Sequence, residues 1–561
     1  MARPVGIGKQ DFEKVITENN FYVDKTMFIK EWWENQDDVT LITRPRRFGK
    51  TLTMDMLEKF FSVRYADRGE LFEGLAIWQE ETYRRLQGTY PVISLSFANV
   101  KIGDYKSSVQ RICQLLEELY RRNSFLLEGD LLSADEKADY RKITMDMSEV
   151  TAGMAVHRMA EYLYRYYGKK VIILLDEYDT PMQEAYANEY WEEMVGFARD
   201  LFNATFKTNP YLERAVMTGI TRVSKESIFS DLNNLAVVTV TSEKYQDCFG
   251  FTQEEVSRAL KEYGLQEQEE NVRDWYDGFT FGSRTGIYNP WSIINFLCER
   301  RFATYWSNTS SNSLVGKLIR EGNRDVKMIM EDLLDGKHLC SEIDEQIVFS
   351  NLGDDENAIW SLFLASGYLK VEKHTMDVEC GIEKYELSLT NKEVRIMFRS
   401  MIKGWFRRSA SAYNAFVKAL LRADIKSMNA YMNRVALDTI SYFDAGRKPS
   451  EAIEPEKFYH GFVLGLIVDL ADRYTVTSNR ESGFGRYDVM LEPSHEEDDA
   501  IIMEFKVYDP EEEESMKETV ASALAQIEDM RYAAALEAKG IAPGRIRKYG
   551  FAFEGKKVLI G

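Results

Sequence analysis

Cysteine and histidine are both rare in this chain, which has 561 residues and only five of each. The cysteines are Cys113, Cys248, Cys298, Cys340 and Cys380. Their odd number and their spacing argue against a disulfide framework, and the absence of an HExxH motif or a Cys/His cluster argues against a zinc site. A reducing compartment fits this composition, so we expect a cytoplasmic protein.

Long apolar runs are missing as well. The longest apolar stretch covers about residues 462–470 (FVLGLIVDL), far short of the roughly 20 residues that a membrane-spanning helix needs. The N-terminal residues, MARPVGIGKQDFEKV, lack the apolar segment of a signal peptide. We therefore expect no membrane partner.

An excess of basic residues is also absent. Lysine and arginine number 71 against 91 acidic residues, so the formal net charge is −20. This balance argues against a globally basic nucleic-acid coat protein, but an enzyme needs only a basic groove. With 45% hydrophobic and 29% charged residues, the composition is that of a globular protein. The length predicts about three or four domains of roughly 100–200 residues each.

Strands and helices alternate in the N-terminal part. Predicted strands cover 38–43, 90–97, 169–179 and 214–220, and predicted helices cover 106–122 and 155–166. This alternation predicts a mainly parallel α/β sheet with helices on both faces. After about residue 245 the pattern becomes helical, and Thr252 followed by Glu255 predicts a capping box at a helix start.

The middle and the C-terminal part differ in their patterns. Between about 340 and 405, short helices precede a predicted hairpin (GYLKVEKH and KYELSLTN), which is compatible with a winged-helix-like unit. The aromatic-rich stretches WYDGF and IYNPW fit core and turns better than a base-stacking platform. A polar segment at 440–458 predicts a boundary. Beyond it a helix (457–472), the strands RYDVML and AIIMEFKV, a long helix (518–539) and a last strand predict the order α-β-β-α-β of a restriction-endonuclease-like core.

A phosphate-binding loop is predicted where the first strand meets a helix. In the P-loop motif GxxxxGK[ST], backbone amides surround phosphate, the lysine contacts the outer phosphates and the hydroxyl binds Mg²⁺. This chain reads RPRRFGKT, with Gly49, Lys50 and Thr51 in place. The alternative is a chance GKT tripeptide that opens a surface helix.

The loop departs from the motif at its first glycine. Arg44 stands there, and a residue other than glycine does not freely adopt a positive φ. Arg44, Arg46 and Arg47 nevertheless add positive charge where we expect the phosphates to lie.

A second nucleotide-site pattern follows about 125 residues later. In VIILLDEYD an apolar run leads into Asp176 and Glu177, a Walker-B pattern in which one carboxylate serves Mg²⁺ and the other points toward the attacking water. On the neighbouring strand Thr218 fits a sensor-like role, and Arg222 could reach a γ-phosphate. The alternative for VIILLDEYD is an ordinary core strand that ends in a polar turn. The alternatives for Thr218 and Arg222 are a buried hydroxyl that bonds to the backbone and a surface arginine.

The sharpest catalytic pattern lies in the C-terminal strands. Asp488 lies in RYDVML, and Glu504 and Lys506 lie in AIIMEFKV. Because side chains alternate along a strand, Glu504 and Lys506 share one face, which Asp488 on the next strand can join. Two carboxylates that hold Mg²⁺ or Mn²⁺ beside a lysine form a phosphodiester-hydrolysis site, the D…(D/E)xK arrangement.

A solvent-facing ladder of ion pairs is the alternative for these three residues. The apolar residues 501–503 argue against it, because unpaired charge in a buried strand is costly. Accessory candidates are Glu456 and His460 on the preceding helix, with a solvent-facing glutamate and a packed histidine as their alternatives. Gln526 on the later helix could touch metal-bound water or DNA, and Tyr532 is a weaker candidate on the same helix.

Several of these motifs, taken in order, resemble one family over nearly the whole chain. They are FYVDKT, RPRRFGKT, LLDEYDTP, TGITRVSKESIFSDLNNL, WYDGF with IYNPWSI, FYHGFVLGL, SNRESGFGRYD and EFKV. The family comprises bacterial proteins that join an AAA-ATPase-like domain to a C-terminal PD-(D/E)xK nuclease-like domain.

This resemblance implies an ASCE-type P-loop module, in which RPRRFGKT is the family's own form of Walker A. It implies that Lys50 and Thr51 bind phosphate and Mg²⁺, that Asp176 and Glu177 serve Walker B, and that Asp488, Glu504 and Lys506 form the nuclease triad. We expect an ATPase-like domain at 1–245, a helical lid-like region at 246–335, a helical or winged-helix-like region at 336–440 and a nuclease-like domain at 441–561.

The leading hypothesis is an ATP-binding, Mg²⁺-dependent nuclease that acts on DNA in preference to RNA and is gated by its ATPase module. A homo-oligomer is consistent with it, because ATPases of this class often supply an arginine in trans. The alternative is a STAND-like nucleotide switch whose nuclease-like domain binds nucleic acid or a partner without cleavage. In a third hypothesis both sites are vestigial and the protein is an interaction module.

Overall fold

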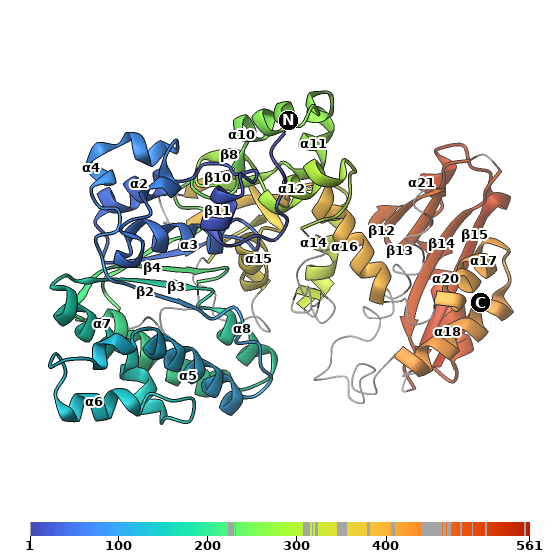
Figure 1. The fold of residues 1–561 in the computed structure, drawn as a ribbon. Helices are drawn as coiled ribbons and strands as arrows, with labels where there is room; N and C mark the ends of the chain where they lie inside the picture. The colour runs from blue at the N-terminus through green and yellow to red at the C-terminus, as the bar shows by residue number, and fades with distance from the viewer. Residues whose placement is uncertain are drawn as a thin grey trace. The chain divides into compact units, whose positions relative to one another are not determined.

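The computed structural model of the chain divides into two compact units (Figure 1). The first comprises Met1–Glu321 and Ile329–Met397, and the second Gly322–Met328 and Phe398–Gly561. The structure describes residues 2–222, 232–306, 324–344, 356–377, 382–405, 410–439, 473–482, 485–495, 497–510, 513–554 and 557–561, with single residues at 229, 315, 316, 318, 319, 463, 467 and 470. Within these residues, no helix is long and apolar enough to cross a membrane.

A five-stranded parallel sheet forms the centre of the first unit, in the order β2-β3-β4-β1-β5. Its strands are β1 (Val39–Thr43), β2 (Val92–Ser96), β3 (Val171–Asp176), β4 (Leu212–Gly219) and β5 (Leu235–Val238). Every residue of β1 and β3 is buried, as a parallel sheet covered on both faces requires. The predicted ASCE-type sheet is confirmed, and β4 lies between the strands that carry the two nucleotide motifs.

Helices cover both faces of this sheet. Figure 1 shows α3 (Lys50–Phe61) on one face and α5 (Tyr105–Arg122) and α7 (Glu149–Tyr167) on the other. Asp104 and Ser148 begin α5 and α7 by accepting hydrogen bonds from backbone N–H groups of the first turn. The remaining helices of this part are α1 (Phe12–Thr17), α2 (Met27–Asn35), α4 (Glu81–Arg84), α6 (Ala134–Arg141), α8 (Thr180–Ala187) and α9 (Trp191–Phe206).

A smaller sheet with three helices follows in the same unit. Its strands β6 (Phe251–Thr252), β8 (Arg284–Tyr288) and β7 (Phe279–Phe281) pair in that order, beside α10 (Gln253–Glu262), α11 (Glu269–Tyr276) and α12 (Pro290–Glu299). The predicted capping box of Thr252 and Glu255 is present at the start of α10. The aromatic stretches supply core: Tyr276 and Tyr288 are fully buried, and Trp275 packs against their cluster.

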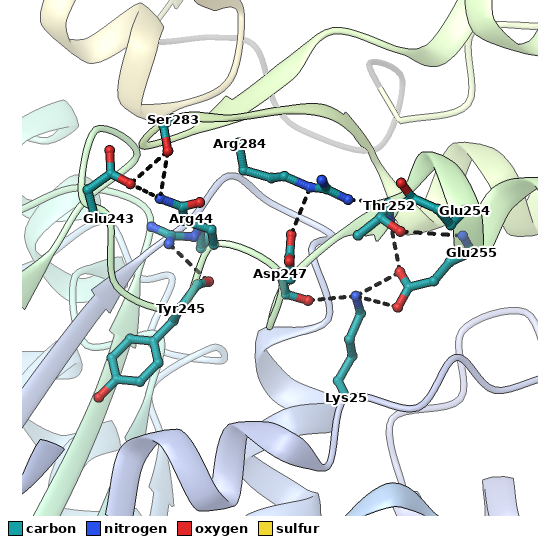
Figure 2. Close-up of polar contacts among 11 residues, drawn as sticks. Lys25, Arg44, Glu243, Tyr245, Asp247, Thr252, Glu254, Glu255, Ser283 and Arg284 are labelled. Atoms are coloured by element: carbon teal, nitrogen blue, oxygen red, sulfur yellow. Dashed lines mark hydrogen bonds and ion pairs between the residues drawn. The ribbon is translucent and has the colours of Figure 1, made fainter. Parts of the chain in front are cut away.

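The N-terminal segment is tied to this smaller part through a lysine of the FYVDKT stretch. The ammonium of Lys25 donates to both carboxylate oxygens of Glu255, at 2.7 and 2.9 Å, and to the carbonyl of Asp247 at 2.6 Å (Figure 2). Glu255 therefore caps α10 and holds the N-terminal segment at the same time.

The hairpin predicted after residue 366 is confirmed. Strands β10 (Leu369–Asp377) and β11 (Ile382–Leu389) pair antiparallel, and β9 (Leu339–Ser341) extends the sheet beside β11. Helix α15 (Glu356–Ala365) precedes the hairpin, and α16 (Lys392–Trp405) follows it. Helix α14 (Arg324–Leu334) lies before β9 in the chain.

The glycine of the WYDGF stretch has no room for a side chain. Gly278 has φ +129, and a Cβ atom there would lie 1.9 Å from the carbonyl oxygen of Thr390. Gly278→Ala should therefore destabilise the first unit by roughly 3 kcal/mol or more, because strain and steric overlap add. Thermal unfolding followed by calorimetry measures this loss.

Gly264→Ala is the matched control for that substitution. Gly264 also has a positive φ of +68, but a Cβ atom there meets nothing within 4 Å. Only the left-handed backbone opposes the change, at about 1–2 kcal/mol. Equal losses in the two variants would contradict the steric account of Gly278.

The second unit contains a mixed sheet in the order β12-β13-β14-β15-β16. Its strands are β12 (Tyr474–Ser482), β13 (Gly485–Pro493), β14 (Ala500–Val507), β15 (Ile546–Glu554) and β16 (Lys557–Ile560). Strands β14 and β15 are parallel and are connected through α20 (Met516–Asp529) and α21 (Ala534–Glu537), whereas the other pairs are antiparallel. The predicted nuclease-like core is confirmed at this level.

Two local predictions in the second unit are wrong, and the sequence does not predict strand β12, an edge strand with weak patterning. The predicted helix 518–539 ends at Asp529, because Arg531 has a positive φ of 51, which stops an α-helix. The last segment forms two paired strands, β15 and β16. The predicted helix 457–472 and the boundary at 440–458 lie almost entirely outside the described residues.

Strand β14 separates two cores by simple alternation. Ile501, Met503 and Phe505 pack in a cluster with residues of α17 (Ala410–Leu421) and α18 (Ile425–Thr439). Ala500 and Ile502 pack on the other face with Ile527 of α20 and residues that follow it. The side chains of residues 504 and 506 therefore point to the α20 face.

Candidate functional site

The predicted phosphate loop connects β1 to α3 and takes left-handed backbone at two positions. Arg47 has φ 65 and Gly49 has φ 83. Gly49 is the cap residue of α3, so the free backbone amides of the first helical turn follow it directly. Free amides at a helix N-terminus are suited to bind an anion.

Lys50 is turned inward and is 6% exposed. Its ammonium donates to the carbonyls of Arg44 and Pro45, at 2.8 Å each. Burial lowers the pKa of Lys50 to about 8, although the nearby carboxylates of Glu177 and Asp176 act in the opposite direction. The ammonium is thus held in a poorly hydrated place, where an anionic phosphate would favour its charged form.

Three elements converge on the carboxylate of Asp176, which is 3% exposed. One of its oxygens accepts a hydrogen bond of 2.7 Å from the hydroxyl of Thr51 on α3, and the other accepts one from the hydroxyl of Thr218 on β4. Burial raises the pKa of Asp176, and the two hydroxyl donors lower it. The structure thus brings together the two predicted Mg²⁺ ligands and the predicted sensor residue, and these hard oxygen donors fit Mg²⁺.

Glu177 occupies a strained position directly after β3. Its φ is 51, in the left-handed region, and its carboxylate accepts a hydrogen bond of 3.2 Å from the hydroxyl of Thr180. Strained residues of this kind persist where the surrounding structure holds them, and they gather at functional sites.

Asp179 is a buried carboxylate that sequence reasoning missed. It is 1% exposed, and its Oδ2 accepts the backbone N–H groups of Ile220 and Thr221, at 2.9 Å each. Its other oxygen, Oδ1, is buried without a hydrogen-bond partner among the described residues, as is the Nε of Arg222. Asp179 therefore links the end of β3 to the loop after β4. The second aspartate of the DEYD sequence was the available signal.

The expected role of Arg44 near the phosphates is wrong. Arg44 is fully buried, and its guanidinium donates to the carbonyl of Thr239 at 2.6 Å. It also donates to the carbonyl of Tyr245 at 3.4 Å (Figure 2). It also lies 4.4 Å from the ring centroid of Phe281. The guanidinium of Arg44 thus anchors the start of the loop to these carbonyls. Arg47 is exposed and lies 4.5 Å over the ring of Trp291.

The two predicted metal-binding carboxylates of the second unit lie on adjacent strands. Asp488 on β13 accepts the backbone N–H of Phe505 at 2.8 Å, and the N–H of Asp488 lies 3.4 Å from Oε2 of Glu504 on β14. Glu504 is only 3% exposed, whereas Lys506 is partly exposed on the same face. The structure therefore brings Asp488 and Glu504 together as the pattern predicts.

Helix α20 contributes a further contact to Glu504. The side-chain amide of Gln526 donates to Glu504 Oε1, and it lies 3.2 Å from the hydroxyl of Tyr532. Burial raises the pKa of Tyr532, which keeps that hydroxyl protonated. Gln526 thus lies beside the carboxylate of Glu504, and its contact with metal-bound water or DNA stays a prediction. Glu456 and His460, the other accessory candidates, lie outside the described residues.

Metal-binding groups of three or more His, Cys, Asp or Glu side chains are not found in the described parts of the chain. The pair of carboxylates at Asp488 and Glu504 offers oxygen donors alone, which suits Mg²⁺ or Mn²⁺ better than zinc. The geometry thus defines two candidate sites, one for a nucleotide phosphate with a metal and one for a metal alone.

The fold and these sites define a P-loop ATPase-like domain joined to a nuclease-like domain. Residues 4–229 match the family described as predicted AAA-ATPase, and residues 454–561 match the PD-(D/E)XK nuclease superfamily. The chain therefore carries an AAA-ATPase-like domain at its N-terminal end and a PD-(D/E)XK nuclease superfamily domain at its C-terminal end. These domains support a nucleotide-binding and nuclease-like function, and both families are typically hydrolases.

One curated relative is an uncharacterized protein in the vnfD 5′ region of Azotobacter chroococcum mcd 1. It is 28% identical over 322 residues, which are 57% of this chain and 56% of the relative. The chain thus spans about half the length of the relative that it matches.

Proposed function

We propose that this chain is an ATP-binding, Mg²⁺-dependent nuclease that hydrolyses phosphodiester bonds in DNA, or in RNA, and that its ATPase-like domain controls cleavage. The observation that carries the proposal is the pair formed by Asp488 and the almost fully buried Glu504, with Lys506 on the same strand face. A buried carboxylate beside another is costly unless a cation or donors compensate it. The Gln526 amide and the Phe505 N–H compensate part of this cost, and a bound metal ion would neutralise the paired negative charge.

Each of the four residues at this site would then have a defined role. Asp488 and Glu504 would hold the metal, which when bound polarises the phosphoryl oxygen and lowers the pKa of water. Lys506 would orient the attacking water or stabilise the charge that develops on the phosphate. Gln526 would keep Glu504 oriented, as residues behind metal ligands do.

The nucleotide site would work through the loop before α3. Lys50 would exchange its two carbonyl partners for the outer phosphates of ATP, since a charged acceptor makes the stronger hydrogen bond. Thr51 and Asp176 would hold Mg²⁺, and Glu177 would orient the attacking water. Thr218 would position Asp176 from the neighbouring strand.

The experiment that tests the function is a cleavage assay with purified protein. Single- and double-stranded DNA and RNA are incubated with Mg²⁺ or Mn²⁺, with and without ATP. Cleavage that requires the metal and changes with ATP supports the proposal. ATP binding without cleavage of any substrate would instead favour a nucleotide switch with a non-cleaving C-terminal domain.

Gln526→Ala should reduce the cleavage rate by roughly 10–100-fold, because the loss of an orienting partner typically weakens a metal site by that factor. The reduction should be accompanied by a higher Mg²⁺ concentration for half-maximal cleavage. Ser522→Ala, an exposed change on the same helix, is the control. An unchanged Mg²⁺ dependence in Gln526→Ala would remove Gln526 from the site.

A further inference from the structure

The phosphate loop is held from outside the nucleotide-binding sheet. The carbonyl oxygen of Arg46 accepts hydrogen bonds from the side-chain amide of Asn289 at 3.2 Å and from the indole N–H of Trp306 at 3.0 Å. These donors lie 243 and 260 positions later in the chain. A Cβ atom on Gly367 would lie 2.8 Å from the ring of Pro45, so the backbone there closely approaches the loop.

The next two loop residues pack against aromatic rings of the same part of the chain. Phe48 is 1% exposed, and its ring centroid lies 4.8 Å from that of Phe279 and 5.4 Å from that of Phe281. The guanidinium of Arg47 lies 4.5 Å from the ring centroid of Trp291. The loop therefore packs against residues 279–291, which follow the parallel sheet in the chain.

The buried carboxylate of Glu393 holds Asn289 and Trp306, the two donors to the Arg46 carbonyl, in place. Glu393, at the start of α16, is 1% exposed and accepts the backbone N–H of Trp306 at 2.6 Å and the hydroxyl of Ser292 at 2.7 Å. Hydrogen bonds to a charged acceptor are about twice as strong as neutral ones. Glu393 thus fixes Trp306 and the first turn of α12 with one side chain.

These contacts close into a ring of hydrogen bonds. Ser292 also donates its backbone N–H, at 3.3 Å, to the side-chain oxygen of Asn289, whose amide reaches the Arg46 carbonyl. The ring runs from Arg46 through Trp306, Glu393, Ser292 and Asn289 and returns to Arg46. A movement of any member must disturb the Arg46 carbonyl or break a buried hydrogen bond.

We infer that Glu393 and Trp306 are positioning residues of the nucleotide site. They fix the Arg46 carbonyl, and with it the loop whose amides and Lys50 would meet the phosphates of ATP. This inference rests on the proposed nucleotide binding. It follows that residues beyond the parallel sheet, between Asn289 and Glu393, determine the conformation of the phosphate loop.

The test measures ATP affinity and turnover in the full-length wild type and five full-length variants. Trp306→Phe keeps the ring but removes the indole N–H, and Glu393→Ala removes the carboxylate. Each should weaken ATP binding by roughly 5–10-fold, as expected for loss of a buried hydrogen bond. Because both residues act on the same Arg46 carbonyl, the double variant should lose less affinity than the product of the two single losses. Trp275→Phe, at a tryptophan that packs against Phe302, is the control.

The outcomes separate this inference from the proposed function. Failure of the wild type to bind ATP would overturn the proposed nucleotide binding, and the inference with it. Wild-type affinity in Trp306→Phe and Glu393→Ala would overturn the inference alone. Recovery of most of the affinity in Glu393→Gln, whose amide oxygen can still accept the Trp306 N–H, supports the positioning role. Independent, fully multiplicative losses in the double variant would contradict it.

Discussion

Glu504→Ala should reduce metal-dependent cleavage by about 10³-fold or more, because it removes one of two carboxylates that would hold the ion. Glu504 is the better buried member of the pair and also accepts a hydrogen bond from the Gln526 amide. Cleavage of labelled DNA in Mg²⁺ and in Mn²⁺ gives the rate. ATP binding by the other domain should be unchanged in the same preparation.

The matched variants for this prediction come from the same sheet. Lys506→Ala should also strongly reduce cleavage but leave metal binding intact, because lysine is not a metal ligand in this arrangement. Glu492→Ala, at a carboxylate that pairs with Lys539 at 2.6 Å on the surface, should cleave like the wild type. Equal cleavage by the wild type, Glu504→Ala and Lys506→Ala would refute the nuclease site.

Lys50→Ala should weaken ATP binding by roughly 100-fold or more. The ammonium is 6% exposed beside the helix N-terminus, and an ion pair with phosphate in such a poorly hydrated place is much stronger than one at the surface. Isothermal titration calorimetry with ATP and Mg²⁺ measures the change. Loss of binding should be accompanied by loss of any ATP effect on cleavage.

Lys30→Ala is the control for the lysine substitution. Lys30 pairs with Glu80 at 3.1 Å and is about one third exposed, so its removal should change ATP affinity little. The melting temperature must be compared as well, because Lys50 also donates to the carbonyls of Arg44 and Pro45. Wild-type ATP affinity in folded Lys50→Ala would exclude this loop as the phosphate site.

Much of the fold could be read from local patterns. The buried strands before RPRRFGKT and in VIILLDEYD predicted a parallel sheet, and the structure has β1 and β3 in it. The alternation in AIIMEFKV placed residues 504 and 506 on one face, opposite Phe505. Both results depend on the 2-residue period of a strand, which is a local property.

Other features depended on neighbours distant in sequence. An isolated Arg44 looks like phosphate-facing charge, because nothing local indicates that the carbonyls of Thr239 and Tyr245 lie within its reach. Strand β12 is an edge strand with weak patterning. The break after Asp529 depends on one left-handed residue, Arg531, which helix propensity does not predict.

Residue patterns alone predict the two candidate sites. These patterns are Gly49–Thr51 before a helix, Asp176 at a strand end, and Asp488 with Glu504 on adjacent strands. Those patterns are local because each depends on strand period or on a loop between two elements. Tertiary packing sets which groups meet: Thr51 with Asp176, Asp179 with the loop after β4, and Trp306 with the Arg46 carbonyl. Such contacts join residues 41 to 260 positions apart, and their partners are set by how the elements pack rather than by any local spacing.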